Sequence, residues 1–275
     1  MKIGVSLPVR EMAGDIEAIK EFAIAAEELG YTHLRVPDQV MRLDNKYLHE
    51  PITLLAFIAA VTKKIELVPS VVILPIRQTL VFARQAAQIE ILSKSRLRIG
   101  VGVGSNREEY QFSNVAFETR GKKCEEQIKV LRQLWSQNTV EFDGRWHSIS
   151  NAGINPLPIN KHIPIWIGAG AKLKKQIISR IALLSDGWFV LASPDDFLQI
   201  NDKIQETAEG AGRVFAEIGT EAGVAVVGPR EKEWESRVQQ WKSIGLSHVC
   251  LRTLGGNLSN SQHLKKLEEV SSVVF

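Results

Sequence analysis

The chain has 275 residues, of which 44% are hydrophobic and 24% are charged, and its formal net charge is +3. Its lysines and arginines are dispersed, whereas nucleic-acid binding needs clustered positive charge. No apolar run approaches the ~20 residues that span a bilayer, and the apolar stretch 3–7 is too short for a signal peptide. We therefore expect a cytoplasmic protein with no nucleic-acid or membrane partner.

The spacing of the cysteines and histidines does not indicate a metal site. Cys124 and Cys250 lie far apart, and the six histidines show no spacing typical of metal ligands. We expect the cysteines to be reduced core thiols, and we expect no bound metal.

Short apolar runs alternate with segments of helical period along almost the whole chain. In the first half, Val- and Ile-rich runs predict buried strands, and apolar residues at three- and four-residue steps predict the helices that follow them. Gly30 suits a helix stop, and Pro51 suits a first helical turn. The expected pairs are strand 3–7 with helix 15–29, strand 33–36 with helix 51–62, strand 65–74 with helix 79–92, and strand 97–101 with helix 122–135.

The longest stretch without a helical pattern is 137–164, which comes after the fourth expected helix. Its segment 140–147 alternates apolar and polar residues around Asp143-Gly144, which predicts a β-hairpin. We interpret the stretch as a short insertion after helix 4, outside the main sheet, and not as a second domain.

The second half of the chain repeats the alternation. The expected pairs are strand 163–167 with helix 172–184, strand 187–191 with helix 194–210, strand 223–227 with helix 232–244, and strand 247–251 with helix 258–270. Apolar strands alternating with helices predict a parallel sheet covered by helices. Eight such pairs without an obvious edge strand favour an α/β fold, a single (β/α)8 TIM barrel over residues 1–275, with an open doubly wound sheet as the alternative.

The active site of such a barrel lies at the carboxyl ends of its strands, where the first notable segment is 100–109. Its alternating glycines, Gly100, Gly102 and Gly104, let backbone approach a planar ligand closely. The segment does not open a helix early in the chain, as a dinucleotide-binding motif does. A glycine-rich turn that closes the strand is the other interpretation.

A second segment, 165–172, places Gly168, Ala169 and Gly170 before an expected helix. Backbone N–H groups at a helix N-terminus form an anion site, and Lys172, Lys174 or Lys175 would add positive charge. The alternative interpretation is a glycine-rich turn between a strand and a helix, with lysines that face solvent and bind no ligand.

A third segment, Pro37-Asp38-Gln39, ends the second expected strand. A polar group at the barrel mouth can hydrogen-bond a ligand or transfer protons. Asp38 equally suits a cap or turn residue of the next segment.

Taken in order, these segments resemble the luciferase-like monooxygenase superfamily, including its branch that uses the deazaflavin coenzyme F420. The similarity covers nearly the whole chain, and it depends on the shared order and spacing of several short stretches. These are 25–31 leading to Pro37-Asp38, Glu50-Pro51, 71–77, 96–104 with Glu109, Arg120 ahead of 131–135, 164–168 and 186–188.

The resemblance implies roles for individual residues. A bulged third strand with a cis peptide, here Ser70–Val71, would support one face of the isoalloxazine ring. Gly102, Val103, Gly104 and Ser105 would run beside the ring or its ribityl chain. Gly168, Ala169 and Gly170 would hold the phosphate. Asp38, Gln39 and Glu109 are the candidate catalytic residues, with Glu109 near the ribityl chain or the substrate cavity.

One position departs from the family's pattern. Many relatives have a histidine after the aspartate at the end of strand two, where this chain has Gln39. Glutamine donates and accepts hydrogen bonds but does not titrate, so proton transfer would have to come from Asp38 or from the substrate.

The resemblance implies an oxidoreductase that binds FMN or coenzyme F420 and acts on a small organic substrate. With reduced FMN and O₂ it would be a monooxygenase that a flavin reductase would serve, and with F420 it would transfer hydride. A homodimer through the helices 51–62 and 79–92 is expected from the family, although barrel packing explains their apolar residues equally well. The alternatives are a non-catalytic flavin-binding protein on this fold and a phosphate-binding aldolase or isomerase barrel.

Overall fold

The computed structural model describes residues 1–12, 14–41, 48–170 and 173–275. Nine parallel strands form one sheet, in the order β3-β2-β1-β11-β10-β9-β8-β5-β4. Their bounds are β1 (Lys2–Ser6), β2 (His33–Val36), β3 (Glu66–Pro69), β4 (Val72–Ile73), β5 (Ile99–Gly102), β8 (Ile165–Ala169), β9 (Gly187–Val190), β10 (Gly219–Ala225) and β11 (His248–Arg252).

The sheet curves back on itself into a barrel. Its two terminal strands, β3 and β4, are the two parts of the strand expected over 65–74, which is interrupted at Ser70–Val71. β3 pairs with β2 and β4 pairs with β5. The Leu67 N–H also donates to the Arg96 carbonyl at 2.8 Å, and the Arg98 N–H donates to the Leu67 carbonyl at 3.1 Å. The predicted TIM barrel is therefore confirmed, and the open sheet is excluded.

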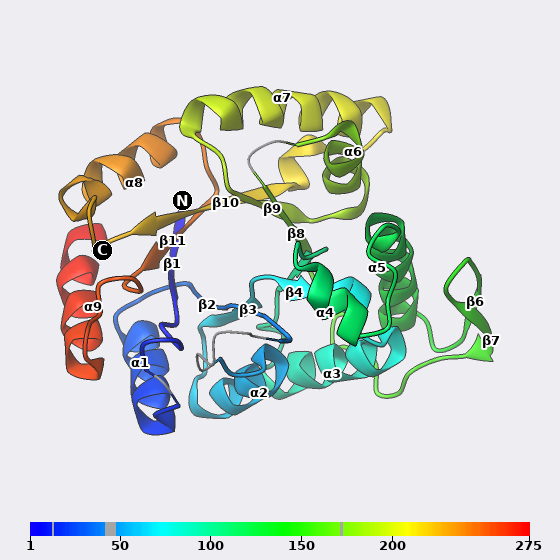
Figure 1. Cartoon of the computed structure of the whole chain (residues 1–275), viewed down its shortest axis with the longest axis horizontal. Helices are drawn as coiled ribbons and strands as arrows, with labels where there is room; N and C mark the ends of the chain where they lie inside the picture. Colours follow the sequence, from blue (N-terminus) through cyan, green and yellow to red (C-terminus); the bar gives the residue numbers. More distant parts are fainter. Residues whose placement is uncertain (13, 42–47, 171–172) are drawn as a thin grey trace.

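Helices surround the strands on the outside of the ring (Figure 1). Their bounds are α1 (Ile16–Glu28), α2 (Pro51–Val61), α3 (Thr79–Leu92), α4 (Arg107–Phe112), α5 (Arg120–Ser136), α6 (Lys175–Leu184), α7 (Pro194–Gly210), α8 (Trp234–Ser243) and α9 (Asn260–Val274), with 3₁₀ turns η1 (Leu74–Ile76), η2 (Phe215–Glu217) and η3 (Glu231–Glu233). No helix within the described ranges is both long enough and apolar enough to cross a membrane.

Local sequence signals explain where several helices begin. The Asp15 side chain accepts a hydrogen bond from the Ala18 N–H at 3.0 Å and caps α1. Ser193 caps α7, whose first residue is Pro194. A reciprocal capping box between Ser259 and Gln262 starts α9.

The structure differs from the expected elements in some of their bounds. The end of the glycine-rich segment 100–109 belongs to a short helix that was not expected, α4, which begins at Arg107. The strand expected over 223–227 begins four residues earlier, at Gly219, so that Glu221 lies inside β10. Between α5 and β8, where a β-hairpin was predicted over 140–147, β6 (Val140–Asp143) and β7 (Ser148–Ala152) do form an antiparallel pair, which projects outward beside α5 (Figure 1).

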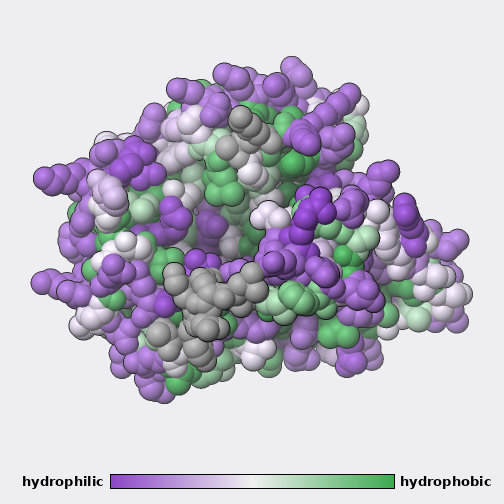
Figure 2. Space-filling view, viewed as in Figure 1, coloured by the Kyte–Doolittle hydropathy of each residue, from purple (hydrophilic) through white to green (hydrophobic). Residues whose placement is uncertain are grey.

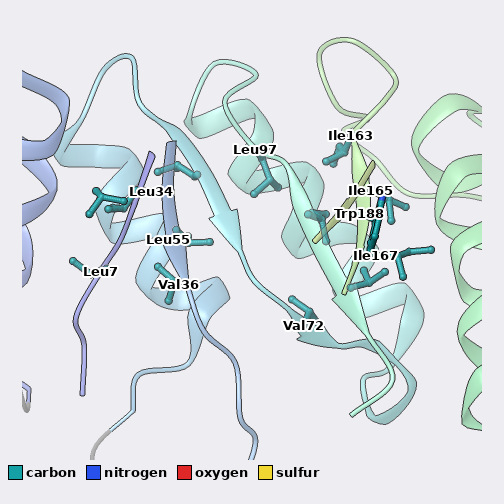
Figure 3. Close-up of a cluster of buried hydrophobic side chains, with 14 of the residues drawn as sticks. Leu7, Leu34, Val36, Leu55, Val72, Leu97, Ile163, Ile165, Ile167 and Trp188 are labelled. Carbon is teal, nitrogen blue, oxygen red and sulfur yellow. The ribbon is translucent and has the colours of Figure 1, made fainter. Parts of the chain in front are cut away.

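The main hydrophobic core lies between the outer face of the barrel and the helices. In β2, for example, Leu34 and Val36 are buried in this layer, whereas His33 and Arg35 point into the barrel, as the two-residue period of a strand requires. Figure 3 shows how strand residues from across the sheet meet helix residues such as Leu55 in this layer. Inside the barrel, a separate small cluster consists of Val68, Trp166 and Phe189, with Val71 packed against it.

One carboxylate ties α1 to the start of β3. Glu27 accepts hydrogen bonds from the backbone N–H groups of Lys63, Lys64 and Ile65 at 2.8, 2.5 and 2.8 Å. Burial raises the pKa of Glu27, but these three bonds and the charge of Arg96 outweigh it, so that the pKa lies below its ordinary value.

We expect the substitution Glu27→Gln to lower stability by about 1–2 kcal/mol at neutral pH, because charged hydrogen-bond acceptors are stronger than neutral ones. A lowered folded-state pKa contributes stability that is present above the unfolded pKa, about 4.3, and is lost as pH falls through the folded value. The difference from wild type should therefore begin to shrink as pH falls below about 4.3 and be lost as pH falls through the lower folded-state pKa. Urea unfolding between pH 3 and 7 measures it. The exposed neighbour Glu28, changed to Gln, is the control, and a difference that does not change with pH would contradict the assignment.

Candidate functional site

The break in the third barrel strand lies at the mouth of the barrel. β3 ends at Pro69, β4 begins at Val72, and the peptide bond between Ser70 and Val71 is cis. This is the bond at which the family resemblance implies a cis peptide. Whether the bulge supports a ring stays a prediction.

The Val71 side chain lies between two of the glycines expected to bind a cofactor. A Cβ atom at Gly102 would lie 2.6 Å from Cγ2 of Val71, and one at Gly168 would lie 2.7 Å from Cγ1. Any larger residue at either position would displace Val71. Val71 is half-buried over Trp166 and Phe189, so β4, β5 and β8 together present an apolar platform towards the mouth.

The loop after β5 adopts a backbone conformation that suits glycine. Gly104 has a φ of +63°, a conformation that glycine adopts without strain. The Tyr110 hydroxyl donates to the Val103 carbonyl and ties the loop to α4. Ser105 is exposed beside this turn.

Two of the three candidate catalytic residues are held in structural hydrogen bonds. Oδ2 of Asp38 accepts from the Ile73 N–H at 3.1 Å and from Nη2 of Arg77 at 3.0 Å. Its side chain is 2% exposed. Asp38 therefore fixes β4 directly after the bulge, and its catalytic role stays a prediction.

Glu109 is also buried, and its Oε1 accepts from the N–H groups of Val40 and Met41 at 3.0 and 3.2 Å. It thereby ties α4 to the segment that follows β2. Gln39, which precedes these two donor residues in the chain, is half-buried. Catalytic roles for Glu109 and Gln39 remain predictions.

The expected phosphate segment ends β8 and leads towards α6. Gly168 and Ala169 belong to the strand, and Gly170 follows it. α6 begins at Lys175, three residues later than expected, while Lys172 lies outside the described residues. Its N-cap residue, Lys174, makes no capping hydrogen bond through its side chain, and a Cβ at Gly170 would meet no atom within 4 Å. Exposed backbone of this kind suits an anion.

The sequence did not predict a cluster of charged side chains inside the barrel. At its centre is Glu221 of β10, which is fully buried. Its Oε1 accepts from Nη1 of Arg35 at 3.0 Å, and its Oε2 accepts from Nη1 of Arg98 at 2.9 Å. Nε2 of His33 lies 3.4 Å from Oε1, and Arg98 also pairs with Glu66 at 2.8 Å.

These contacts set the charge state of the cluster. Burial raises the pKa of Glu221, but His33, Arg35 and Arg98 together hold it well below its ordinary value, so the carboxylate is ionised. Burial, Arg98 and His33 lower the pKa of His248 to about 3, which keeps this imidazole neutral.

Potential metal-ligand atoms of His33, Glu221 and Cys250 lie within 4.8 Å of one another. Burial raises the pKa of the Cys250 thiol to about 12, so it is protonated, whereas a metal binds the thiolate. The adjacent guanidinium groups of Arg35 and Arg98 also repel a cation. The cluster is therefore a poor cation site.

A family model described as luciferase-like monooxygenase matches residues 1–269. The chain therefore belongs to the luciferase-like monooxygenase family. It is 30% identical over 210 residues to an uncharacterised protein of Mycobacterium tuberculosis, covering 70% of this chain and 71% of the relative. It is 26% identical over 238 residues to an F420-dependent glucose-6-phosphate dehydrogenase of Amycolatopsis mediterranei, covering 82% of this chain and 70% of the relative.

The fold comparison agrees with this membership. The crystal structure of the monooxygenase RslO1 from Streptomyces bottropensis matches with a TM-score of 0.83 at 17% identity, covering 100% of this chain and 98% of the other. At that identity the match shows the shared barrel. The relatives of this luciferase-like protein include F420-dependent dehydrogenases as well as uncharacterised proteins, and they do not specify its substrate or its cofactor.

The burial of Glu221 between two arginines leads to a testable prediction. We expect the substitution Glu221→Gln to lower stability by about 3–5 kcal/mol, because it leaves the buried Arg98 and the half-buried Arg35 without their shared counter-charge. Chemical unfolding followed by circular dichroism measures the loss. The control is Glu118→Gln, which breaks an exposed pair with Arg107 and should leave the unfolding midpoint unchanged. Equal effects of the two substitutions would show that the interior cluster is not stabilising.

Proposed function

We propose that this protein is an oxidoreductase that binds a deazaflavin or flavin cofactor with its ring against Val71. The observation that carries the proposal is the apolar platform beside the cis peptide, formed by Val71 between Gly102 and Gly168. A planar ring needs such a flat apolar support with little side-chain bulk around it.

The residues beside this platform fit the other parts of the cofactor. The loop Gly102–Ser105 would lie along the ring or the ribityl chain, where glycine backbone allows close approach. Gly168, Ala169 and Gly170 would bind the phosphate through backbone N–H groups. The uncapped first turn of α6 supports this part of the proposal.

Coenzyme F420 is the first candidate because the relative from Amycolatopsis mediterranei is F420-dependent. FMN is the second candidate, since the family as described includes monooxygenases. The bound group would supply hydride transfer in the first case and O₂-dependent oxygenation in the second. The barrel residues would bind and orient the ring and exclude water from one of its faces, while Asp38 and Glu109 hold the surrounding loops.

The proposed partners follow from these two chemistries. The substrate is a small organic molecule, and an FMN enzyme would in addition need a flavin reductase. We also propose a homodimer through α2 and α3, in the cytoplasm. The exposed apolar residues Leu80 and Val81 of α3 support an interface on this side of the barrel.

The cofactor can be tested by titrating the full-length protein with F420 and with FMN, followed by absorbance and by thermal unfolding. A ligand that binds the folded state alone raises the melting temperature with its concentration. We expect saturable binding of F420 and a higher melting temperature. Preference for reduced FMN would instead indicate a monooxygenase, and binding of neither cofactor would overturn the proposal.

The substitution Gly170→Val tests the phosphate site. The new side chain has free space in the protein alone, so the melting temperature without cofactor should not change. Because the side chain would occupy the place proposed for the phosphate, we expect cofactor affinity to fall at least tenfold, or about 1.4 kcal/mol. The control is Gly210→Val at the end of α7, where a Cβ also meets nothing within 4 Å. Unchanged affinity in Gly170→Val would move the phosphate elsewhere.

A further inference from the structure

A cavity of about 300 Å³ opens at the mouth of the barrel. One edge of it, at Phe189 and Val190, borders Gly168 and Ala169 of the expected phosphate segment, and its arginines Arg237 and Arg252 lie on α8 and β11. Its wall is formed by β9, β10, β11 and α8, and Arg35 of β2 reaches it from inside the barrel. Figure 2 shows that the molecule is hollowed at the centre of this face and that hydrophilic residues line the hollow.

The charge of the cavity wall is strongly positive. Four arginines line it, namely Arg35, Arg230, Arg237 and Arg252, and they face a single carboxylate, Glu221. Both oxygens of that carboxylate are already bound by Arg35 and Arg98. Asp195 and Asp196 in the first turn of α7 are exposed and do not belong to the lining.

Two of these guanidinium groups are unpaired. Arg237 and Arg252 make no hydrogen bond or ion pair with any residue in the described part of the chain, whereas Arg230 pairs with the exposed Glu233 at 2.5 Å. The Arg252 side chain lies over Gly223, where a Cβ would be 3.5 Å from its Nε. Burial and the neighbouring charges of Arg230 and Arg252 lower the pKa of Arg237, and the charge of the nearby Glu233 offsets only part of this effect. An anion placed between these like charges would relieve their repulsion.

The cavity is directly connected to the platform proposed to hold the cofactor ring. Nη2 of Arg35 lies 2.5 Å from Oγ of Ser70, the residue before Val71. Phe189 lines the cavity and also belongs to the cluster beneath Val71, and the Arg35 guanidinium lies 4.7 Å from the centre of its ring. A molecule held in the cavity would therefore reach the side of the ring.

We propose that this cavity binds the anionic group of the substrate, a carboxylate or a phosphate, through the guanidinium groups of Arg237 and Arg252. The proposal rests on the proposed function and names its substrate class: a small acidic organic molecule whose other end reaches the platform at Val71. Planar guanidinium groups bind both anions through paired hydrogen bonds.

The same chemistry would suit a phosphate of the cofactor. The position of the cavity favours the substrate, because β9 and β10 separate Arg252 on β11 from Gly168–Gly170 on β8. The cofactor phosphate has its own candidate site at that segment, where the backbone is open.

The test is isothermal titration of the full chain with inorganic phosphate and with succinate, at constant ionic strength, with and without saturating cofactor. The variant is the double substitution Arg237→Gln and Arg252→Gln. Because neither side chain has a partner in the described structure, the variant should fold with an unchanged melting temperature. The control is Arg84→Gln on α3, an exposed arginine outside this cavity.

We expect saturable binding of at least one anion by wild type and by Arg84→Gln, at least tenfold weaker binding by the double variant, and retention of binding when the cofactor is present. Equal binding by the double variant, or no saturable binding of either anion by wild type, would overturn the proposal. Loss of anion binding on cofactor addition, together with weaker cofactor binding by the double variant, would assign the cavity to the cofactor. Failure of the proposed function would appear separately, as absence of cofactor binding by wild type.

Discussion

A carboxylate enclosed between guanidinium groups inside the barrel determines how the mouth of this protein is organised. Glu221 is fully buried, and an ionised carboxylate is tolerated there because Arg35 and Arg98 donate to its two oxygens. This ion pair fixes the position of the Arg35 side chain inside the barrel. From there Arg35 donates a hydrogen bond to Ser70 at the strand break and also lines the cationic cavity. One buried charge thus links the proposed ring support to the proposed anion site.

The two halves of the mouth differ in chemistry because different side chains face inward on the two sides of the barrel. On β5 and β8, Gly102 and Gly168 face the interior, and Val71 fills the space that they leave. On β10 and β11, Gly223 leaves room for the long side chain of Arg252. Small residues therefore expose an apolar face on one side and accommodate a charged group on the other. A hydride or oxygen transfer enzyme needs both, since the cofactor ring is flat and apolar whereas a small substrate has to be oriented by polar contacts.

Much of the fold was predictable because its signals are local. The helices 79–92 and 194–210 and the strand 33–36 occur with the expected bounds, since Pro194, Gln78 and the apolar periodicity mark them within a few residues. The start of β10 was not predictable from hydrophobic pattern, because Glu221 is a charged residue inside a buried strand. The Ser70–Val71 bulge and the glycine segments were identified by their order along the chain, whereas the structural hydrogen bonds of Asp38 and Glu109 join groups 35 and 69 residues apart.

The sequence by itself therefore determined the eight alternating strand–helix units, the family to which they are similar, and the glycine-rich segments at the strand ends. These depend on periodicity, capping and backbone freedom, which act between neighbours in the chain. The tertiary structure alone decided which charged residues meet inside the barrel and which arginines share a cavity. Residues 35, 221 and 252 come from three different strands and residue 98 directly precedes a fourth, so these groups come together only after the sheet has closed, and water is then excluded from around the buried Glu221 and Arg98.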